Sequence, residues 1–407
     1  MNNRILVVED SRSFRNYLNS QISKINMEVV SAESLVEATA ILENDTDFLC
    51  AVLDYCLPDG QEGEVIDLAL SHDMKVIVVT GKFNEQLRDI MLAKGVIDYI
   101  LKDSFASVSY LLPLLTRLNR NKSHKALVVD DSKTVRKHLV HLLDHHYIRS
   151  VQAEDGVEAL EILKSDPEIT LIITDNTMPE KDGISMTREI RLTYDRSQLA
   201  ILGISTAESK TVTAQFLKAG ANDYLKKPFN QEEFYCRIQN LLNMKDISDD
   251  MFKLANQDAL TGLWNRRYLF SNIDESKPQR NVAMLDIDFF KKVNDNYGHE
   301  GGDQALTTVS HIIAIYFKDD LAARFGGEEF CIVNYGDYDA FVQRLESMRQ
   351  RIEKTAIPYN NEEIKLTISI GATKAKRDID TMIRIADERL YAAKINGRNL
   401  VISKDVD

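Results

Sequence analysis

Short apolar runs that end in acidic residues recur along the N-terminal half of the chain. ILVVEDS begins at Ile5 and ALVVDDS at Ala126, and the runs AVLD and LIITD end at Asp54 and Asp175. Between them, segments such as SFRNYLNSQI and TVRKHLVHLL carry apolar residues three or four positions apart, as amphipathic helices do. Strands that alternate with helices predict two parallel, doubly wound sheets with helices on both faces, in an α/β fold.

The two N-terminal segments share the spacing of their candidate residues, as copies of one domain would. In each copy an aspartate follows the acidic end of the first strand by 45 residues, and a lysine follows a hydroxyl-bearing residue by 22. The residues are Glu9, Asp54, Thr80 and Lys102 in the first copy, and Asp130, Asp175, Ser205 and Lys227 in the second. We therefore predict two similar domains, residues 1–121 and 122–243.

The candidate residues of each copy are expected to meet at one edge of its sheet, because ligand sites of parallel sheets lie beyond the carboxyl ends of the strands. The carboxylates that gather there are Glu9, Asp10 and Asp54 in the first copy, and Asp130, Asp131 and Asp175 in the second. Such an all-oxygen ligand set suits Mg²⁺ or Mn²⁺. An aspartate beside a divalent cation and a lysine can accept a phosphoryl group, since the cations offset the charge of its oxygens.

On these residues, both segments resemble the receiver domains of response regulators. The resemblance implies that a cognate histidine kinase or phosphotransfer protein phosphorylates Asp175 or Asp54. The residues that would sense the phosphoryl group are Ser205 and Lys227 in the second copy and Thr80 and Lys102 in the first, with Tyr99 and Tyr224 reporting it to the far face.

The first copy departs from the family pattern directly after its lysine. Asp103 stands where the family usually has proline, as the second copy does at Pro228. Asp175 is therefore a stronger candidate acceptor than Asp54, and the first copy can instead serve as a packing surface. The sequence leaves this division of labour open.

A segment without glycine or proline, EEFYCRIQNLLNMKDISDDMFKLANQ, follows the second copy. Its apolar residues have helical spacing, so we predict that the last helix of the second copy continues through a linker at residues 244–256. Two copies of the chain could pair along this helix. Its heptads are too few and irregular for a coiled coil, and a solvated linker helix is the favoured interpretation.

A different set of sequence motifs begins at Asp258. The motifs DALTGLWNRR, DIDFFKKVNDNYGHEGGD, GGEEF and AKINGRN follow one another in this order. A strand that ends at Asp286 and a hairpin whose glycine turn precedes Glu328 and Glu329 would form a carboxylate cluster able to hold two divalent cations. Gly327 gives this turn the freedom to approach a phosphate closely.

Residues 257–407 resemble the GGDEF family of diguanylate cyclases over their whole length, here in the GGEEF form. The resemblance implies an α+β fold of the nucleotide-cyclase and polymerase-palm type, and a reaction that condenses two GTP into cyclic di-GMP and pyrophosphate. The implied metal ligands and catalytic groups are Asp286, the Ile287 carbonyl, Glu328 and Glu329, with Glu329 also tied to deprotonation of the 3′-hydroxyl.

The resemblance also implies a set of substrate-binding residues. Asn294 and Asp303 match the pair that reads guanine, which fits their chemistry because a carboxylate accepts from the guanine N1–H and its amino group. Lys394 and Arg398 match the cations that hold the triphosphate, and the backbone amides around Phe289 and Phe290 match its cradle. One such domain holds one GTP, so the reaction requires a homodimer, whose formation the phosphorylated receivers would control.

The family commonly carries an inhibitory Arg-x-x-Asp motif before the glycine turn. Here Phe317 replaces the arginine whereas Asp320 retains the aspartate, and a phenylalanine supplies none of the donors by which arginine holds phosphate. We therefore expect weak product inhibition. The alternative to an active enzyme is a catalytically silent module that binds GTP or cyclic di-GMP, which the intact set of candidate residues disfavours.

Composition narrows the function classes further. A net charge of −13 and the lack of a basic helix-turn-helix segment argue against nucleic-acid binding, including a DNA-binding response regulator. The four cysteines lack metal-site spacing, and no apolar run reaches the length of a membrane span or a secretory signal, so a cytoplasmic protein is expected. The histidines His141, His145 and His146 are interpreted as surface residues.

Overall fold

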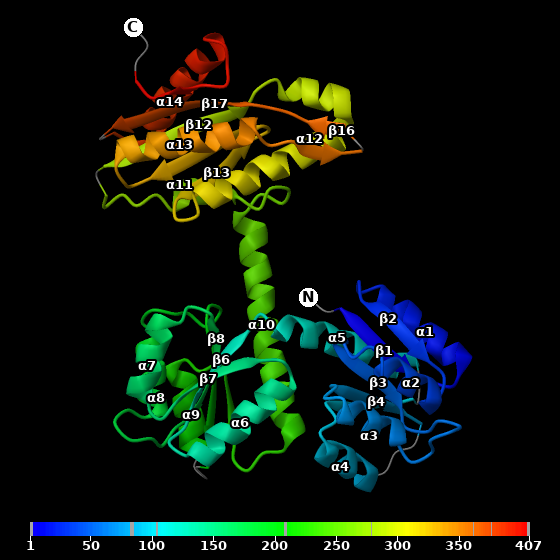
Figure 1. Ribbon diagram of the computed structural model, residues 1–407. Helices are drawn as coiled ribbons and strands as arrows, with labels where there is room; N and C mark the ends of the chain where they lie inside the picture. The colour runs from blue at the N-terminus through cyan, green and yellow to red at the C-terminus, as the bar shows by residue number, and fades with distance from the viewer. Residues whose placement is uncertain are drawn as a thin grey trace. The chain divides into compact units, whose positions relative to one another are not determined.

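The apolar runs of the N-terminal half form two five-stranded parallel sheets (Figure 1). Their strand orders are β2-β1-β3-β4-β5 and β10-β9-β8-β6-β7, which are the same order when each domain is counted from its own first strand. In both, the chain reverses its direction of travel across the sheet between the first and third strands, where a doubly wound sheet forms its ligand crevice. The predicted fold class of both domains is confirmed.

The structure, a computed structural model, describes residues 3–81, 85–102, 105–206, 210–277, 279–360, 362–375 and 377–404. The first domain contains β1 (Arg4–Val8), α1 (Arg12–Ser23), β2 (Glu28–Ala32), α2 (Leu35–Leu42), β3 (Cys50–Asp54), α3 (Glu64–Ser71), β4 (Val76–Thr80), α4 (Glu85–Lys94), β5 (Asp98–Leu101) and α5 (Phe105–Asn121). The second contains β6 (Lys125–Val129), α6 (Lys133–His145), β7 (Arg149–Ala153), α7 (Gly156–Ser165), β8 (Ile169–Asp175), α8 (Gly183–Ile190), β9 (Ala200–Ser205), α9 (Lys210–Ala219), β10 (Asp223–Lys226) and α10 (Gln231–Asn256).

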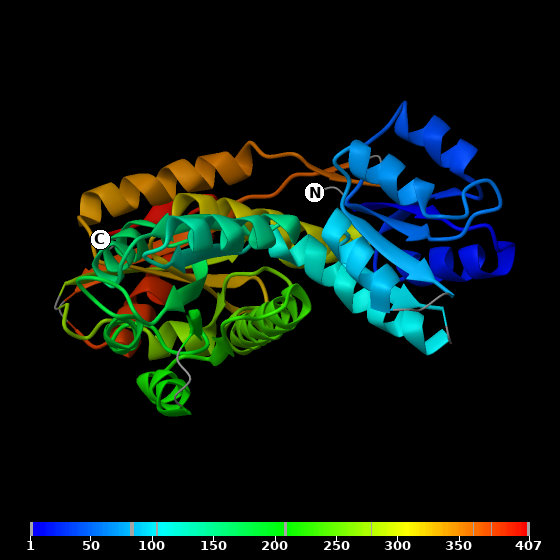
Figure 2. The ribbon, with the colours of Figure 1, turned by 90° about the horizontal axis from the view of Figure 1, so that it is seen from below.

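Alternate residues of the strands supply the two layers of each core. In β1, Ile5 and Val7 pack with α1 and α5, whereas Leu6 and Val8 pack with α2, α3 and α4. Figure 2 shows helices on both sides of these strands. Because side chains of a strand point alternately to its two faces, an unbroken apolar run is what a strand covered on both sides requires.

The C-terminal part of the chain forms a mixed six-stranded sheet in the order β11-β13-β14-β12-β17-β18. Its four central strands are antiparallel, and the short outer strands β11 and β18 pair in parallel with their neighbours. The elements are β11 (Trp264–Asn265), α11 (Arg266–Ser271), β12 (Arg280–Ile287), α12 (Phe290–Tyr316), β13 (Leu321–Gly326), β14 (Glu329–Asn334), α13 (Tyr338–Glu353), β15 (Ile357–Tyr359), β16 (Glu362–Ile364), β17 (Ile368–Ala375), α14 (Ile379–Ile395) and β18 (Val401–Ile402). This agrees with the predicted antiparallel-centred α+β fold.

The two faces of this sheet are covered by different helices. Residues of α12 and α13 pack on the face that presents Leu285 and Phe330, whereas α11 and α14 pack on the face that presents Met284 and Cys331. In Figure 1, α13 and α14 lie on opposite sides of β12 and β17. The central strands are therefore fixed from both sides, and their ends carry the candidate site.

The chain divides into two compact units, Met1–Ser248 and Asp249–Asp407. Both parallel-sheet domains belong to the first unit. Of the helices that the structure describes, none is long and apolar enough to cross a membrane. All four cysteines are free thiols, and Cys50 and Cys331 are buried.

The two parallel-sheet domains of the first unit meet around one carboxylate, Asp246 of α10. Arg117 of α5 donates to Asp246 at 2.6 Å, and His124 Nε2 lies 3.0 Å from the other oxygen of the same carboxylate. Burial raises the pKa of Asp246, but the bond with His124 and the charge and bond of Arg117 outweigh it, so that this pKa falls to about 2. The last helix of the first domain is thus tied to the helix that leaves the second.

The same junction corrects one expectation from the sequence. His146 is buried rather than on the surface, and its ring packs at a tilt against Tyr235 of α10, with centroids 3.5 Å apart. Its backbone carbonyl accepts a bond from Asn121 Nδ2 at 2.9 Å. The contact partners come from distant segments of the chain, so a helical pattern around His146 could not reveal them.

The lowered pKa of Asp246 predicts a pH-dependent contribution to stability. Because the unfolded carboxyl has a pKa near 3.9, the contribution is complete above about pH 5 and is lost as the pH falls through about 4 toward 2. Urea denaturation should show that Asp246→Asn lowers the free energy of unfolding of the first unit by about 1–2 kcal/mol at pH 7, with a difference from the native chain that shrinks over this window. Glu161→Gln, which removes an exposed carboxylate of α7, is the matched control. A difference that stays constant from pH 7 to pH 3 would contradict the assignment.

Candidate functional site

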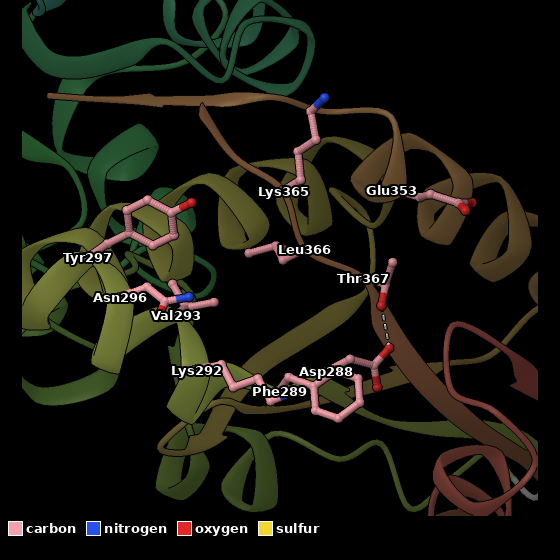
Figure 3. Close-up of a pocket in the computed structure, with 10 residues that line it drawn as sticks. All are labelled: Asp288, Phe289, Lys292, Val293, Asn296, Tyr297, Glu353, Lys365, Leu366 and Thr367. Atoms are coloured by element: carbon pink, nitrogen blue, oxygen red, sulfur yellow. Dashed lines mark hydrogen bonds between the residues drawn. The ribbon is translucent and has the colours of Figure 1, made fainter. Parts of the chain in front are cut away.

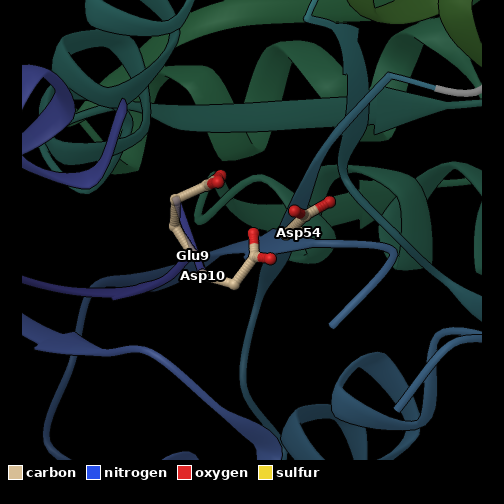
Figure 4. Close-up of side chains that lie close together, drawn as sticks. All are labelled: Glu9, Asp10 and Asp54. Carbon is tan, nitrogen blue, oxygen red and sulfur yellow. The ribbon is translucent and has the colours of Figure 1, made fainter. Parts of the chain in front are cut away.

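Three carboxylates of the first domain converge where β1 and β3 end (Figure 4). One oxygen each of Glu9, Asp10 and Asp54 can be chosen so that all lie within 4.8 Å of one another. Lys102, directly after β5, reaches this group, with its Nζ 2.5 Å from Glu9 and 2.6 Å from Asp54. The predicted neighbourhood of acids and lysine is therefore present, and the hydroxyl-bearing Thr80 is buried at the end of the adjacent strand β4.

The electrostatics of this cluster suit a divalent cation. Burial raises the pKa of Glu9, and the charge of Asp54 raises it further, against the opposing effect of Lys102. Burial is the largest of these effects, so a single ammonium does not offset the whole cost of burying these acids, and the oxygen-only donor set is the one Mg²⁺ prefers. Asp103, which replaces the usual proline, lies outside the described residues.

The second domain repeats the arrangement with a different pairing. Lys227 donates to Asp130 at 2.8 Å and to Asp175 at 2.7 Å. Burial lowers the pKa of Lys227, but these bonds and charges outweigh it and raise the pKa. Ser205 is buried at the end of β9, and the Tyr224 hydroxyl lies 3.4 Å from its carbonyl. With Asp131 exposed, the three acids of this domain do not gather within 4.8 Å as those of the first do, within the part of the chain that the structure describes.

The acids of the C-terminal unit come together through strand register. In the antiparallel pair of β12 and β14, Asp286 lies directly opposite Glu329, the first residue after the glycine turn. Gly327 has a φ of 52°, in the left-handed region that glycine enters without a Cβ clash, and Glu328 completes the turn. Arg324 stabilises the turn: it donates to the Gly327 carbonyl at 2.9 Å and pairs with Asp258 at 3.0 Å.

Asp286 is the buried centre of this group. Burial raises its pKa, the charges of Glu328 and Glu329 raise it further, and the ammonium of Lys394 opposes them from 2.8 Å. The oxygens of the three acids do not all lie within 4.8 Å of one another. As in the first domain, oxygen donors around a buried carboxylate fit divalent cations. The Ile287 carbonyl belongs to the next residue, at the end of the same strand.

The candidate guanine-reading residues lie on the two parts of α12. The helix is interrupted at Gly298, which has a φ of 72°, and this break separates Asn294 from the exposed Asp303. Gly302 touches Asn294 so closely that a Cβ at Gly302 would lie 2.0 Å from the Asn294 Oδ1. The structure therefore gives the second glycine of HEGGD a role that the motif alone did not identify, that of leaving room for the Asn294 amide.

The candidate triphosphate cradle begins at Phe289, the residue before α12. Phe289 has a φ of 56° and an exposed ring, whereas Phe290 is buried in the core. The Arg398 guanidinium lies 4.4 Å from the Phe289 ring centroid and the Lys292 ammonium lies 4.5 Å from it. A helix N-terminus with two cations at the residue before it is suited to an anion.

A cavity of about 340 Å³ lies beside this cradle (Figure 3). Its walls come from the first turns of α12, the end of α13 and the segment that leads into β17. The lining residues are Asp288, Phe289, Lys292, Val293, Asn296, Tyr297, Glu353, Lys365, Leu366 and Thr367. The candidate guanine-reading pair, Asn294 and Asp303, is not among them.

The residues at the expected inhibitory motif are taken up by the core. Phe317 is 1% exposed and packs against Phe341 with ring centroids 5.8 Å apart. Arg344 lies over the Phe317 ring and also pairs with Asp320, which accepts a further bond from Asn334 Nδ2 at 2.7 Å. The surviving aspartate is thus engaged within the protein.

Comparisons with known proteins agree with this architecture. The response regulator receiver domain family matches residues 5–108 and 126–239, and the family described as diguanylate cyclase, GGDEF domain, matches residues 255–400. The chain belongs to the response regulators with a GGDEF diguanylate cyclase domain. Response regulator PleD of Caulobacter vibrioides (strain NA1000 / CB15N) is 28% identical over 470 aligned positions, which span 99% of this chain and 100% of that protein.

Two further relatives match part of this chain. Diguanylate cyclase A of Treponema denticola is 34% identical over 182 positions, covering 40% of this chain and 49% of that protein. A crystal structure of a two-component system response regulator/GGDEF domain protein is 36% identical, with a TM-score of 0.56, and covers 60% of this chain and 99% of that one. The predicted family and fold of the response regulator are therefore confirmed.

The close contact at Gly302 yields a test of the expected base site. Gly302→Ala would force the Asn294 amide to move, so we expect the KM for GTP to rise roughly tenfold, the effect of losing one hydrogen bond to substrate. Alanine favours a helix more than glycine does, so we expect no fall in the melting temperature that would explain the higher KM. Gly336→Ala, whose added Cβ would make ordinary 3.5 Å contacts, is the control. An unchanged KM in Gly302→Ala would remove Asn294 from the base site.

The engagement of Asp320 predicts weak product inhibition. Cyclic di-GMP added to the enzyme should reduce its initial rate little at concentrations near that of the protein, because neither Phe317 nor the paired Asp320 offers a free group to the product. Calorimetry with cyclic di-GMP checks binding directly. Tight binding that Asp320→Ala abolishes, with normal melting of that variant, would overturn this expectation.

Proposed function

We propose that the chain catalyses the condensation of two GTP molecules into cyclic di-GMP and pyrophosphate. The observation that carries the proposal is the register of β12 and β14, which sets Asp286 opposite Glu329 at the glycine turn with Lys394 beside it. The C-terminal domain at residues 257–407 would be the catalytic domain, preceded by receivers at 1–121 and 122–243 and a linker at 244–256.

The residues around this turn supply complementary groups for the reaction. Mg²⁺ or Mn²⁺ held by Asp286, Glu328, Glu329 and the Ile287 carbonyl would offset the charge of the triphosphate. Glu329 is placed to accept the proton of the attacking 3′-hydroxyl. Lys394, which pairs with Asp286, is placed to hold triphosphate oxygens together with Arg398 and the amides around Phe289 and Phe290.

The proposed substrate is GTP rather than ATP. Asp303 is exposed and acceptor-only when ionised, so it can accept from the guanine N1–H and amino group, whereas adenine N1 carries no proton. Asn294, held against Gly302, adds an amide that both donates and accepts. This pair favours guanine because, with adenine bound, its acceptor oxygens would lack hydrogen-bond donors.

Two GTP molecules must face one another, so the active form would be a homodimer. The helix α10 exposes Met244, Ile247, Met251 and Leu254, which are spaced by three, four and three residues. This is the spacing of a coiled-coil seam, although the sequence favoured a solvated linker. A second copy of α10 would cover this stripe and bring two catalytic domains into proximity.

Phosphorylation of a receiver by a histidine kinase or phosphotransfer protein would control the meeting of the two domains. Lys102 and Lys227 each contact the candidate acceptor of their own domain, Asp54 and Asp175. The sequence favours Asp175, whereas the tighter carboxylate group surrounds Asp54. In our proposal either aspartate would accept the phosphoryl group beside its lysine, and the signal would reach α10 through the junction at Asp246.

One assay tests this function. The purified full-length chain with GTP and Mg²⁺ should form cyclic di-GMP, and beryllofluoride, a phosphoryl mimic, should increase the rate together with the dimer fraction measured by light scattering. We expect Glu329→Gln to lower kcat at least a hundredfold, as removal of a general base does. The rate increase should disappear in Asp175→Ala or in Asp54→Ala, which identifies the working acceptor. If the folded chain forms no product under either condition, the chain is a silent binding module.

A further inference from the structure

Asp288 lies between two candidate functional positions, yet it belongs to neither the proposed metal ligands nor the phosphate cradle. It is two residues after Asp286 and directly precedes Phe289. Its carboxylate is only 4% exposed and points toward the segment around Thr367, at the wall of the cavity in Figure 3. A buried carboxylate is costly unless it is fully bonded, so its partners indicate what it holds.

The Asp288 carboxylate accepts three hydrogen bonds from two other parts of the chain. Thr367 Oγ1 donates to Oδ2 at 2.7 Å and Ser369 Oγ donates to Oδ1 at 2.6 Å, both from the start of β17. The backbone amide of Asn399 donates to Oδ2 at 3.0 Å from the loop after α14. Asp288 therefore connects the end of β12, the start of β17 and the loop that carries Arg398.

The bond to Asn399 holds a loop that has an unfavourable backbone conformation. Arg398 and Asn399 have φ values of 64° and 51°, and neither is glycine. Two consecutive residues in the left-handed region persist only where surrounding contacts fix them. The Asn399 side chain is also held, by a bond from Arg349 and a bond of 2.8 Å to Glu353.

The fixed loop determines where the Arg398 guanidinium lies. It sits over the Phe289 ring, 4.4 Å from its centroid, at the N-terminus of α12. Asp288 thus holds both sides of the candidate triphosphate site, since it is covalently joined to Phe289 and hydrogen-bonded to the residue after Arg398. We propose that Asp288 is a positioning residue that sets Arg398 against the phosphate cradle, an inference that rests on the proposed function.

Strand pairing alone does not require this carboxylate. β12 and β17 are already joined by a continuous antiparallel register from Arg280 opposite Ala375 to Ile287 opposite Ile368, and the backbone amide of Asp288 extends it by donating to Thr367 at 2.9 Å. The carboxylate bonds to Thr367 and Ser369 join strands that are already paired, whereas the bond to the Asn399 amide reaches a loop outside this pairing. An aspartate here therefore acts on the loop more than on the sheet.

Steady-state kinetics of the full chain test the positioning role. Asp288→Ala should raise the KM for GTP roughly tenfold or more, the effect of releasing one bond to a charged group, while kcat stays within about threefold. Asp288→Asn can still accept from Thr367 and Asn399 and should restore a KM within about threefold of the native chain. Should Asp288→Ala not fold, Asp288→Ser, whose short hydroxyl does not reach Asn399, is expected to raise the KM in the same way.

A double-mutant cycle separates positioning from general destabilisation. If Asp288 acts through Arg398, Asp288→Ala should not raise the KM further in an Arg398→Ala background. Tyr338→Phe is the matched control, because the Tyr338 hydroxyl donates to the Ala372 carbonyl at 3.0 Å, in the middle of β17 and away from Asp288. It should lower the melting temperature without changing the KM.

The outcomes distinguish this inference from the proposed function. Product formed by the native chain, together with an unchanged KM in Asp288→Ala or an effect that adds fully to that of Arg398→Ala, would overturn the positioning role alone. No product from the native chain would overturn the proposed function. In that case, binding of a fluorescent GTP analogue to Asp288→Ala and to the native chain still decides the positioning role, which requires weaker binding in the variant.

Discussion

Each of the three candidate sites depends on the same interaction, the pairing of a crowded carboxylate at the end of a strand with one lysine from another element. Lys102 serves Glu9 and Asp54, Lys227 serves Asp130 and Asp175, and Lys394 serves Asp286. Removing water from several acids at once is costly, and one ammonium offsets only part of this cost. The residual negative potential is what a divalent cation requires, so the same physical arrangement suits phosphoryl acceptance in two domains and nucleotidyl transfer in the third.

The sites differ in how the chain brings the acids together. In the first parallel sheet, β1 and β3 are neighbouring strands, so the acids at their carboxyl ends lie close together. Lys102, which contacts them, directly follows β5. In the antiparallel sheet, the register of β12 with β14 places Asp286 opposite Glu329, and the lysine arrives from the last turn of a helix. The second solution leaves the glycine turn at the end of the sheet, where Gly326 and Gly327 are exposed.

Sequence patterns predicted the features that depend on local order along the chain. The strands, the 45-residue spacing of acids that both copies share and the acids of the glycine turn follow from residues that are close in sequence or recur at a fixed distance. The features that the sequence missed depend on side chains that meet from distant segments. Gly302 matters because of Asn294 eight residues earlier across a helix break, Asp288 because of Asn399, and the buried His146 because of Tyr235. Two adjacent glycines inside a helix were a signal, since glycine weakens a helix and usually stands there for a reason of packing.

The packing around Phe317 bears on how such an enzyme can be controlled. An arginine at this position would have to leave the core to reach a ligand, whereas the phenylalanine stays buried and draws Arg344 over its ring. Arg344 then pairs with Asp320 and offsets its charge. Both of these residues, which could have contacted product, are instead engaged within the fold. Control by product through this surface would require breaking a partly buried ion pair. The exposed stripe of α10, from Met244 to Leu254, spans Asp246, the carboxylate to which Arg117 and His124 are bound, so a contact made along the stripe lies next to the junction of the two N-terminal domains.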